Sequence, residues 1–175
     1  MIIKWRISLM ELWDILDESG KKTGRIVTQG TPLKQGEYRL IIDAWIINKN
    51  DEFLISKRIP TKQPEPNKWN PVCGSAISGE ESISAALREV KEELGIILDA
   101  NNGKLIKRFK VWNGIVDVWL FRQEVDIDRV VLQKEETDDV MWATSKVVKQ
   151  IIDNGDFISY ERIPYVDELF CACGV

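Results

Sequence analysis

Three glutamates, Glu89, Glu92 and Glu93, are spaced by three and four residues in a segment that also contains Arg88. On a helix these offsets place the carboxylates on adjoining turns of one side, where like charges repel one another. Arg88 can pair with one of them, Glu92, four residues ahead, but the rest of the negative charge needs another cation. Hard divalent cations such as Mg²⁺ prefer carboxylate oxygens. The spacing therefore predicts a metal site, with a solvated acidic helix face as the alternative.

A loop and a helix must position these carboxylates. Ser82 is a suitable N-cap and Gly95 a suitable C-terminal stop, so we expect a helix between them. The loop before the helix contains Gly74 and Gly79, which allow the backbone to approach a ligand closely. The apolar face of the helix consists of side chains that recur at helical spacing: Ile83, Ala86, Leu87, Val90 and Leu94.

A metal held by such a cluster could cleave a pyrophosphate bond. That reaction needs charge neutralisation on the phosphate oxygens, a positioned water, and a base or metal that activates this water. A carboxylate cluster with one or more Mg²⁺ ions can provide all of these, whereas a single glutamate cannot. The net charge of -4 gives no support for binding a nucleic-acid polymer, whereas a small phosphorylated molecule remains a possible substrate because a metal can supply positive charge locally.

The stretch 74–96 resembles the Nudix box in every fixed position. These positions are a glycine, Glu80, Arg88-Glu89, the aliphatic Val90, Glu92-Glu93, Gly95 and the aliphatic Ile96. Nudix hydrolases cleave a nucleoside diphosphate linked to another moiety X. The resemblance implies a Mg²⁺-dependent pyrophosphohydrolase, with Mn²⁺ as an alternative metal, and an α/β/α sandwich with a mixed central sheet.

The resemblance also implies roles for individual residues. Glu89, Glu92 and Glu93 would be the metal ligands, together with the backbone carbonyl of Cys73, which directly precedes the box. A glutamate from a later loop would act as a further ligand or as the base; Glu136 matches best, Glu135 is the second choice, and a solvated loop charge is the alternative reading of Glu136. The residues implied to support the site structurally are Arg88, Glu80, Gly74 and Gly95.

A softer resemblance, over about residues 10 to 145, is to the isopentenyl-diphosphate-isomerase-like branch of Nudix proteins. It is carried by the segments 11–17, 24–25, 36–38 and 45–48. Because Met10 stands where such chains begin, residues 1–9 could precede an alternative start. Within this branch the resemblance favours a nucleoside di- or triphosphate as the substrate.

Two other functions remain as alternatives. Val72-Cys73-Gly74 resembles the segment that carries the catalytic cysteine of the isomerase, but the isomerase builds its metal site on histidines. Here Arg39 and Ser75 stand where histidines would be expected, and the box is intact, so we favour a hydrolase and expect Cys73 to be a small buried residue near the site. The third function is a Nudix-fold binding module without turnover, against which the three intact glutamates argue.

The composition indicates one globular domain, residues 1–175. The chain is 44% hydrophobic and 30% charged, and its length suffices for one sizeable core. It contains no apolar run of about eighteen residues, and residues 1–10 are too short and too charged for a signal peptide; we expect a cytoplasmic protein. Three cysteines are too few for a disulfide framework, and the lack of histidine excludes triads, Cys-His dyads and zinc sites that need one. A homodimer is compatible with these features.

The order of elements agrees with a sheet covered on both faces. We expect a β-hairpin within an N-terminal extension, 1–37, and then a central strand over 38–48, where the run is almost continuously apolar. The segment 59–70 should be a surface loop beside the substrate, with Trp69 as an anchor. Asn113-Gly114 predicts a hairpin turn. Further expected strands and helices are 52–58, 104–112, 115–124, 140–143, 144–154 capped by Thr144, and 160–170 beginning near Pro164.

Three tryptophans could stack a nucleotide base: Trp45, Trp112 and Trp119. Each lies on an expected strand and carries a large apolar area, so we expect all three to be core residues.

Overall fold

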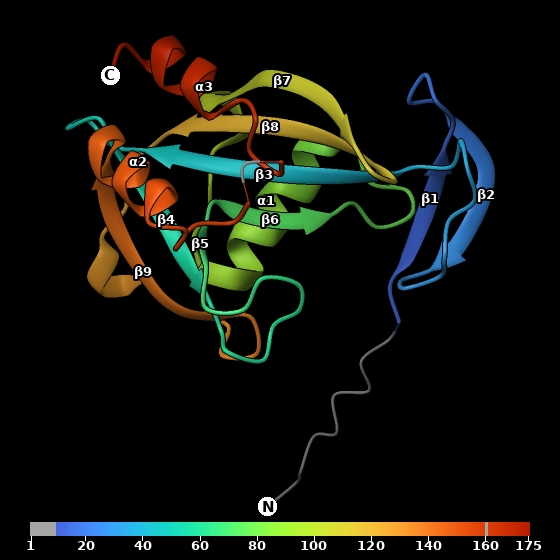
Figure 1. The fold of residues 1–175 in the computed structure, drawn as a ribbon, viewed down its shortest axis with the longest axis horizontal. Coiled ribbons are helices and arrows are strands. Elements are labelled where there is room, and N and C mark those ends of the chain that lie inside the picture. The colour runs from blue at the N-terminus through green and yellow to red at the C-terminus, as the bar shows by residue number, and fades with distance from the viewer. Residues whose placement is uncertain (1–9, 160) are drawn as a thin grey trace, which may run out of the picture.

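The computed structural model describes residues 10–159 and 161–175 (Figure 1). Two predictions fall on residues outside this range. They concern residues 1–9, for which we considered an alternative start and a signal peptide, and Tyr160, the first residue of the expected closing helix. No helix in the described part of the chain has the length and hydrophobicity to cross a membrane.

A mixed sheet centred on β3 (Arg39–Ile47) forms the middle layer (Figure 1). Residues 41–47 of β3 are buried, as expected for an apolar strand that is covered on both faces. β8 (Gly114–Arg122) runs parallel to β3 in continuous register, and β7 (Gly103–Val111) pairs antiparallel with β8 at the sheet edge.

Two strands share the other edge of β3. β4 (Glu52–Arg58) pairs with β3 only at Ile46 and Ile47 and then diverges, continuing its pairing with β5 (Trp69–Asn70) and β9 (Thr137–Thr144). β6 (Val72–Ser75) pairs antiparallel with residues 41–44 of β3. The sequence did not predict β5 or β6. Their position matters because Asn70 of β5 and residues 73–75 of β6 line the cavity described below.

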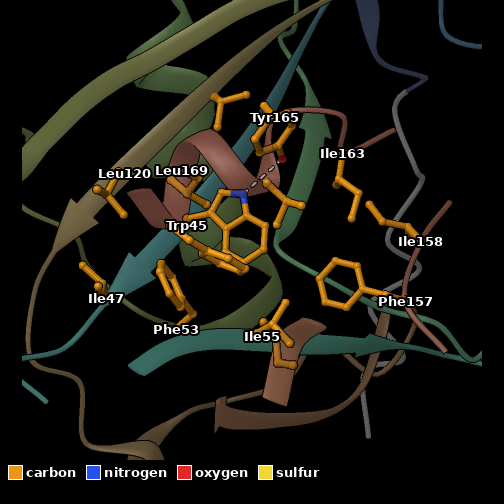
Figure 2. Close-up of a cluster of buried hydrophobic side chains, with 14 of the residues drawn as sticks. Trp45, Ile47, Phe53, Ile55, Leu120, Phe157, Ile158, Ile163, Tyr165 and Leu169 are labelled. Carbon is orange, nitrogen blue, oxygen red and sulfur yellow. Dashed lines mark hydrogen bonds between the residues drawn. The ribbon is translucent and has the colours of Figure 1, made fainter. Parts of the chain in front are cut away.

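Helices cover both faces of this sheet. α1 (Ser82–Leu94) packs on one face through Ala85, Ala86 and Val90. α2 (Ser145–Asp153) and α3 (Val166–Cys173) pack on the other face, where Trp45 is fully buried and donates a hydrogen bond from Nε1 to the hydroxyl of Tyr165, 3.1 Å away (Figure 2). The predicted α/β/α sandwich with a mixed central sheet is confirmed.

The N-terminal hairpin is confirmed as well. β1 (Leu12–Leu16) and β2 (Lys22–Thr28) form a separate two-stranded sheet. Asp14 attaches this hairpin to the loop before α1, because its carboxylate accepts hydrogen bonds from the hydroxyl of Ser78 at 2.7 Å and from the backbone N–H of Gly79 at 2.9 Å. The hairpin therefore supports the loop that leads into the acidic helix.

The ends of α1 were predicted with one error. Gly95 ends the helix in a left-handed conformation, as expected. The N-cap position is occupied by Glu81 and not by Ser82, which is the first helical residue. The hydroxyl of Ser82 accepts a hydrogen bond from Nε1 of Trp119 at 2.8 Å. The hydroxyl that would have capped α1 locally is thus engaged in a tertiary hydrogen bond with Trp119.

Thr144 caps α2 through a hydrogen bond from the backbone N–H of Val147, as predicted. α3 begins at Val166, shortly after Pro164. Trp69 is half-buried against the core, in agreement with an anchoring role. The β7–β8 hairpin forms, but its turn residues are Trp112 and Asn113, and Gly114 already belongs to β8.

Candidate metal and active site

A cavity of about 660 Å³ lies where β4 diverges from β3, within the usual size range of small-molecule sites, roughly 300–1,000 Å³. One part of its wall is acidic and belongs mainly to α1, whereas Arg58 and Lys62 contribute positive charge from the end of β4 and the following loop. The segment 59–70 does border the cavity, as expected. The predicted site residues that line it are Cys73, Gly74, Glu89, Glu92, Glu93 and Glu136.

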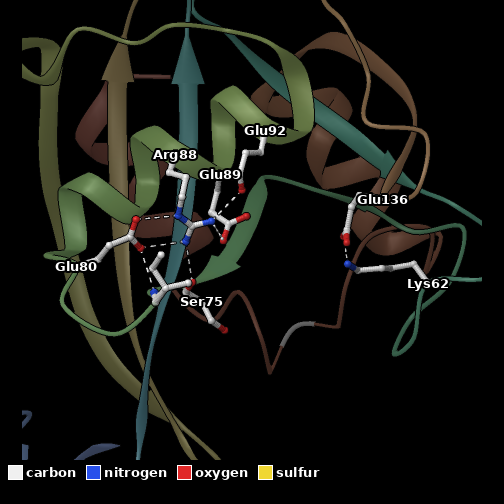
Figure 3. Close-up of polar contacts among 8 residues, drawn as sticks. Lys62, Ser75, Glu80, Arg88, Glu89, Glu92 and Glu136 are labelled. Carbon is white, nitrogen blue, oxygen red and sulfur yellow. Dashed lines mark hydrogen bonds and ion pairs between the residues drawn. The ribbon is translucent and has the colours of Figure 1, made fainter. Parts of the chain in front are cut away.

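Arg88 joins the glutamates of α1 to the loop before it (Figure 3). Its Nε donates to Glu80 at 2.8 Å, and Nη2 donates both to Glu80 and to the backbone carbonyl of Ser75, each at 3.0 Å. Nη1 lies 2.9 Å from carboxylate oxygens of both Glu89 and Glu92. One planar guanidinium thus fixes β6, the loop and two carboxylates relative to one another.

Gly74 allows Glu89 to lie against β6. A Cβ atom built on Gly74 would be 2.0 Å from Cδ of Glu89, a distance at which two carbon atoms cannot coexist. Any side chain at this position would therefore displace the Glu89 carboxylate. The requirement for glycine here is one of space.

The backbone carbonyl of Cys73 faces away from β3. In an antiparallel pair, alternate residues direct their N–H and C=O groups toward the partner strand. The backbone N–H of Ala76 donates to the carbonyl of Leu40 in β3 at 3.0 Å, so Gly74, two residues earlier, also directs its N–H and C=O groups toward β3. The N–H and C=O groups of Cys73 and Ser75 therefore point away from β3. Since the carbonyl of Ser75 receives Arg88, the carbonyl of Cys73 points toward the same edge, beside α1.

Glu93 and Glu89 are carboxylates in an environment that disfavours their charge. The Glu93 residue is only 7% exposed, and burial together with the nearby Glu89 raises its pKa to about 8. Burial also raises the pKa of Glu89 to about 7, although Arg88 opposes this rise. Glu92 differs, because its side chain is 52% exposed. A bound cation would remove the penalty for ionising the two buried groups.

Glu136 lines the cavity together with the glutamates of α1 and forms an ion pair with Lys62 (Figure 3). Burial lowers the pKa of the Lys62 amine, an effect that Glu93 and Glu89 partly reverse. The loop that carries Glu136 is tied to the end of β4, since the backbone N–H of Ile59 donates to the carbonyl of Glu136 at 3.2 Å. Its role as ligand or base stays a prediction.

Cys73 is half-buried and lines the cavity opposite Asp43 of β3. Burial and the adjacent Asp43 raise the pKa of the Cys73 thiol well above its usual value. Asp43 itself is fully buried, accepts a hydrogen bond of 2.7 Å from the hydroxyl of Tyr165 and lies 3.7 Å from Arg162. A thiol in these surroundings stays protonated and is a poor nucleophile.

Several residues of the cavity wall were not identified from the sequence as site residues. They come from segments far apart in the chain and have no common spacing, so no local pattern reveals them. Burial lowers the pKa of the Arg39 guanidinium, and nearby Arg162 lowers it further. The unpredicted lining residues that carry charge or an aromatic ring are Glu11, Arg39, Arg58, Lys62, Glu65, Trp112 and Arg162.

The residues present fit a hard divalent cation. Within residues 10–159 and 161–175, no three carboxylate or thiol groups converge at metal-binding distance in this structure. The donor set is nevertheless all oxygen, and the carboxylates of the buried Glu93 and the half-buried Glu89, both with raised pKa values, lie beside an outward-facing carbonyl on the adjoining strand. Carboxylate and carbonyl oxygens are the ligands that Mg²⁺ and Mn²⁺ accept.

The sandwich, the glycine-containing loop and the glutamate helix together define the protein as a Nudix-type hydrolase. The family model of the NUDIX domain matches residues 37–164. An uncharacterised Nudix hydrolase of Listeria monocytogenes is 37% identical over 152 residues, which cover 86% of this chain and 90% of the relative. The chain belongs to the Nudix hydrolase family.

Other similarities are partial or concern the fold. An isopentenyl-diphosphate Delta-isomerase of Paenarthrobacter aurescens is 33% identical over 97 residues, 55% of this chain and 52% of that protein. The crystal structure of DR0079 from Deinococcus radiodurans has a TM-score of 0.75 at 20% identity and covers 90% of this chain and 98% of its own. A bifunctional NMN adenylyltransferase/ADP ribose pyrophosphatase of Francisella tularensis, solved with AMP and a manganese ion, has a TM-score of 0.61 at 23% identity, covering 75% of this chain and 41% of that one.

Proposed function

We propose that this protein is a Mg²⁺-dependent hydrolase that cleaves the pyrophosphate bond of a nucleoside diphosphate derivative, with a nucleoside di- or triphosphate as the first candidate. The observation that carries the proposal is the cavity in which Glu89, Glu92 and Glu93 face Arg58 and Lys62. Carboxylates can hold the metal there, while the cations pair with phosphate oxygens. Mn²⁺ is an alternative metal, as in the solved Francisella tularensis structure.

In this proposal Glu89, Glu92, Glu93 and the carbonyl of Cys73 hold the metal. When bound, Mg²⁺ supplies neutralisation of the phosphate charge and lowers the pKa of a bound water. Arg88 is not a ligand but keeps Glu89 and Glu92 on one side of α1.

Glu136 is the candidate for a further ligand or for the base that accepts a proton from the attacking water. It lines the cavity opposite α1, and its pairing with Lys62 keeps both groups beside the substrate. Lys62 would then exchange this carboxylate for a phosphate oxygen when the substrate binds. This exchange would release Glu136 toward the water.

The isomerase alternative rests on Cys73, which does line the cavity. The chain contains no histidine with which to build an isomerase-type metal site, and burial with Asp43 keeps the thiol protonated. A binding module without turnover has no need for three glutamates around one cavity. Both alternatives are decided by the same assay.

That assay measures phosphate and pyrophosphate release from nucleoside di- and triphosphates, nucleotide sugars and isopentenyl diphosphate, with and without Mg²⁺. We expect metal-dependent release from one class, lost in Glu93→Gln with the fold retained in circular dichroism. Isomerisation of isopentenyl diphosphate without hydrolysis would contradict the proposal. If no compound releases phosphate or pyrophosphate or is isomerised, and Glu93→Gln still binds a ligand without metal, the protein would be a binding module. The cytoplasmic location and the homodimer stay predictions.

A further inference from the structure

The structure separates the three tryptophans that could stack a base. Trp45 is fully buried among core residues, and Trp119 is half-buried with its Nε1 bonded to Ser82. Trp112 is 65% exposed and lines the cavity. The expectation that all three belong to the core is confirmed for Trp45 and Trp119 and is wrong for Trp112.

Trp112 holds an unusual backbone conformation, with φ at 47°. Side chains as large as tryptophan rarely adopt positive φ, and glycine is the favoured residue at the first position of such a two-residue turn. The nearest glycine, Gly114, lies outside the turn because it is the first residue of β8 and pairs with Arg39. The position with positive φ is therefore occupied by Trp112.

The turn is held firmly in this conformation. The backbone N–H of Arg39 donates to the carbonyl of Asn113 at 3.0 Å, and the Asn113 side chain donates to the carbonyl of Glu37 at 3.3 Å. These bonds attach the β7–β8 turn to the beginning of β3 (Figure 1). A strained residue that its surroundings hold in place, at the wall of a functional cavity, is a candidate for a role in binding.

Trp112 and the glutamates lie at opposite ends of the cavity. Gly114, which directly follows the turn, pairs with Arg39 of β3, whereas Gly74 pairs with Ile42. Glu89 packs against Gly74. Arg39 and Ile42 are three residues apart, which corresponds to about 10 Å along β3. The distance between Trp112 and Glu89 is larger still, because β8 and β6 pair with opposite edges of β3. This separation suits a ligand whose aromatic ring is joined to a diphosphate through a sugar.

Two arginines, Arg39 and Arg162, also line the cavity. The Arg39 guanidinium stacks over the ring of Trp13 at 4.5 Å, and its buried Nε has no hydrogen-bond partner within the described residues. Arg162 reaches the same cavity and is held near the buried Asp43. Guanidinium groups with unused donors match the phosphate oxygens that such a ligand would place here.

We propose that Trp112 is the stacking surface for the base of the nucleotide, with Arg39 and Arg162 facing the phosphates that connect the base to the glutamates. This inference rests on the proposed function and specifies its substrate class as compounds with an aromatic base. Every base has a π-face, so stacking on Trp112 favours nucleotides over base-free phosphates and discriminates little among the bases.

The test is a binding measurement that needs no turnover. By calorimetry, AMP and ribose 5-phosphate, which differ in the base, are compared on the wild type, Trp112→Ala, Trp112→Phe and Leu105→Ala. Leu105 is the matched control, because it is an exposed apolar residue of β7 that does not line the cavity. Because stacking on an aromatic ring contributes about 1–3 kcal/mol per base, Trp112→Ala should weaken AMP binding by about 5- to 150-fold.

Ribose 5-phosphate should bind Trp112→Ala as it binds the wild type, Trp112→Phe should keep most of the AMP affinity, and Leu105→Ala should match the wild type. Unchanged AMP affinity in Trp112→Ala, an equal loss for both ligands, or no preference of the wild type for AMP would overturn the stacking role. Since AMP has no pyrophosphate bond, failure of the hydrolase proposal in the release assay would be seen separately.

Discussion

Replacing Glu93 by glutamine should stabilise the metal-free protein near pH 8 while it abolishes hydrolysis. Burial and Glu89 raise the pKa of the Glu93 carboxyl from 4.5 to about 8 in the folded protein. Below pH 4.5 this carboxyl is protonated in both states, and the full stability is present. As the pH rises from 4.5 to 8, the unfolded chain releases the proton and the folded protein retains it, so the free energy of unfolding falls.

The size of this effect follows from the two pKa values. Each pKa unit corresponds to about 1.4 kcal/mol, so the fall due to Glu93 approaches about 5 kcal/mol by pH 8. This is a large part of the stability of a typical domain, about 5–15 kcal/mol. Glu89, whose pKa burial raises to about 7, adds a fall in the same direction that ends about one pH unit earlier.

The measurement is guanidinium chloride unfolding in EDTA at pH values from 5 to 8.5. The wild type should lose stability steadily with pH, whereas Glu93→Gln should lose much less, because the amide does not ionise. Glu92→Gln is the matched control on the same helix; its side chain is 52% exposed, and the wild-type pH dependence should persist. Addition of Mg²⁺ at pH 8 should restore stability to the wild type and not to Glu93→Gln. Parallel curves for the wild type and Glu93→Gln would refute the reasoning.

Three further substitutions test the contacts around the site. Gly74→Ala should move the Glu89 carboxylate, whose Cδ lies 2.0 Å from the added Cβ position, and weaken Mg²⁺ binding in calorimetry; wild-type affinity would contradict the steric argument. Tyr165→Phe removes the hydrogen bond of 2.7 Å to buried Asp43 and should lower the free energy of unfolding by about 1–3 kcal/mol in denaturant titrations. Asp14→Ala removes the two hydrogen bonds that the Asp14 carboxylate accepts from the loop before α1 and leaves the backbone bond from Ser78 N–H to the carbonyl of Leu12 at 2.7 Å; it should speed proteolysis within residues 10–37, and an unchanged cleavage rate would show that the remaining contacts hold the hairpin.

Local signals were sufficient for the elements that the sequence predicted correctly. The apolar spacing of α1 and its Gly95 stop lie within one segment, as does the hydroxyl of Thr144 that caps α2. The predictions failed where a distant contact decided the outcome. Trp119 took the hydroxyl expected to cap α1, and the pairing of Gly114 with Arg39 of the distant strand β3 places this glycine in β8, one residue beyond the turn.

The same distinction applies to the site. The three glutamates could be predicted because a single helix carries them, and helical spacing is visible in the sequence. The cationic and aromatic part of the cavity is assembled from β3, the loop after β4, the β7–β8 turn and the segment before α3. Arg39 and Arg162 are 123 positions apart in the printed sequence, and only the folded sheet brings them to one wall.

The glutamates of α1 would couple the stability of this protein to the proposed metal. α1 must press its apolar face on the sheet, and this packing carries Glu93 into a position where its charge is disfavoured. A ligand that binds only the folded state adds about 2.7 kcal/mol of stability at a concentration one hundred times its dissociation constant. That gain offsets about half of the fall expected for Glu93 near pH 8. If α1 packed loosely on the sheet, water could reach these carboxylates and their charge would need no metal. In this proposal the close packing of α1 on the sheet is therefore the reason why the site favours a cation.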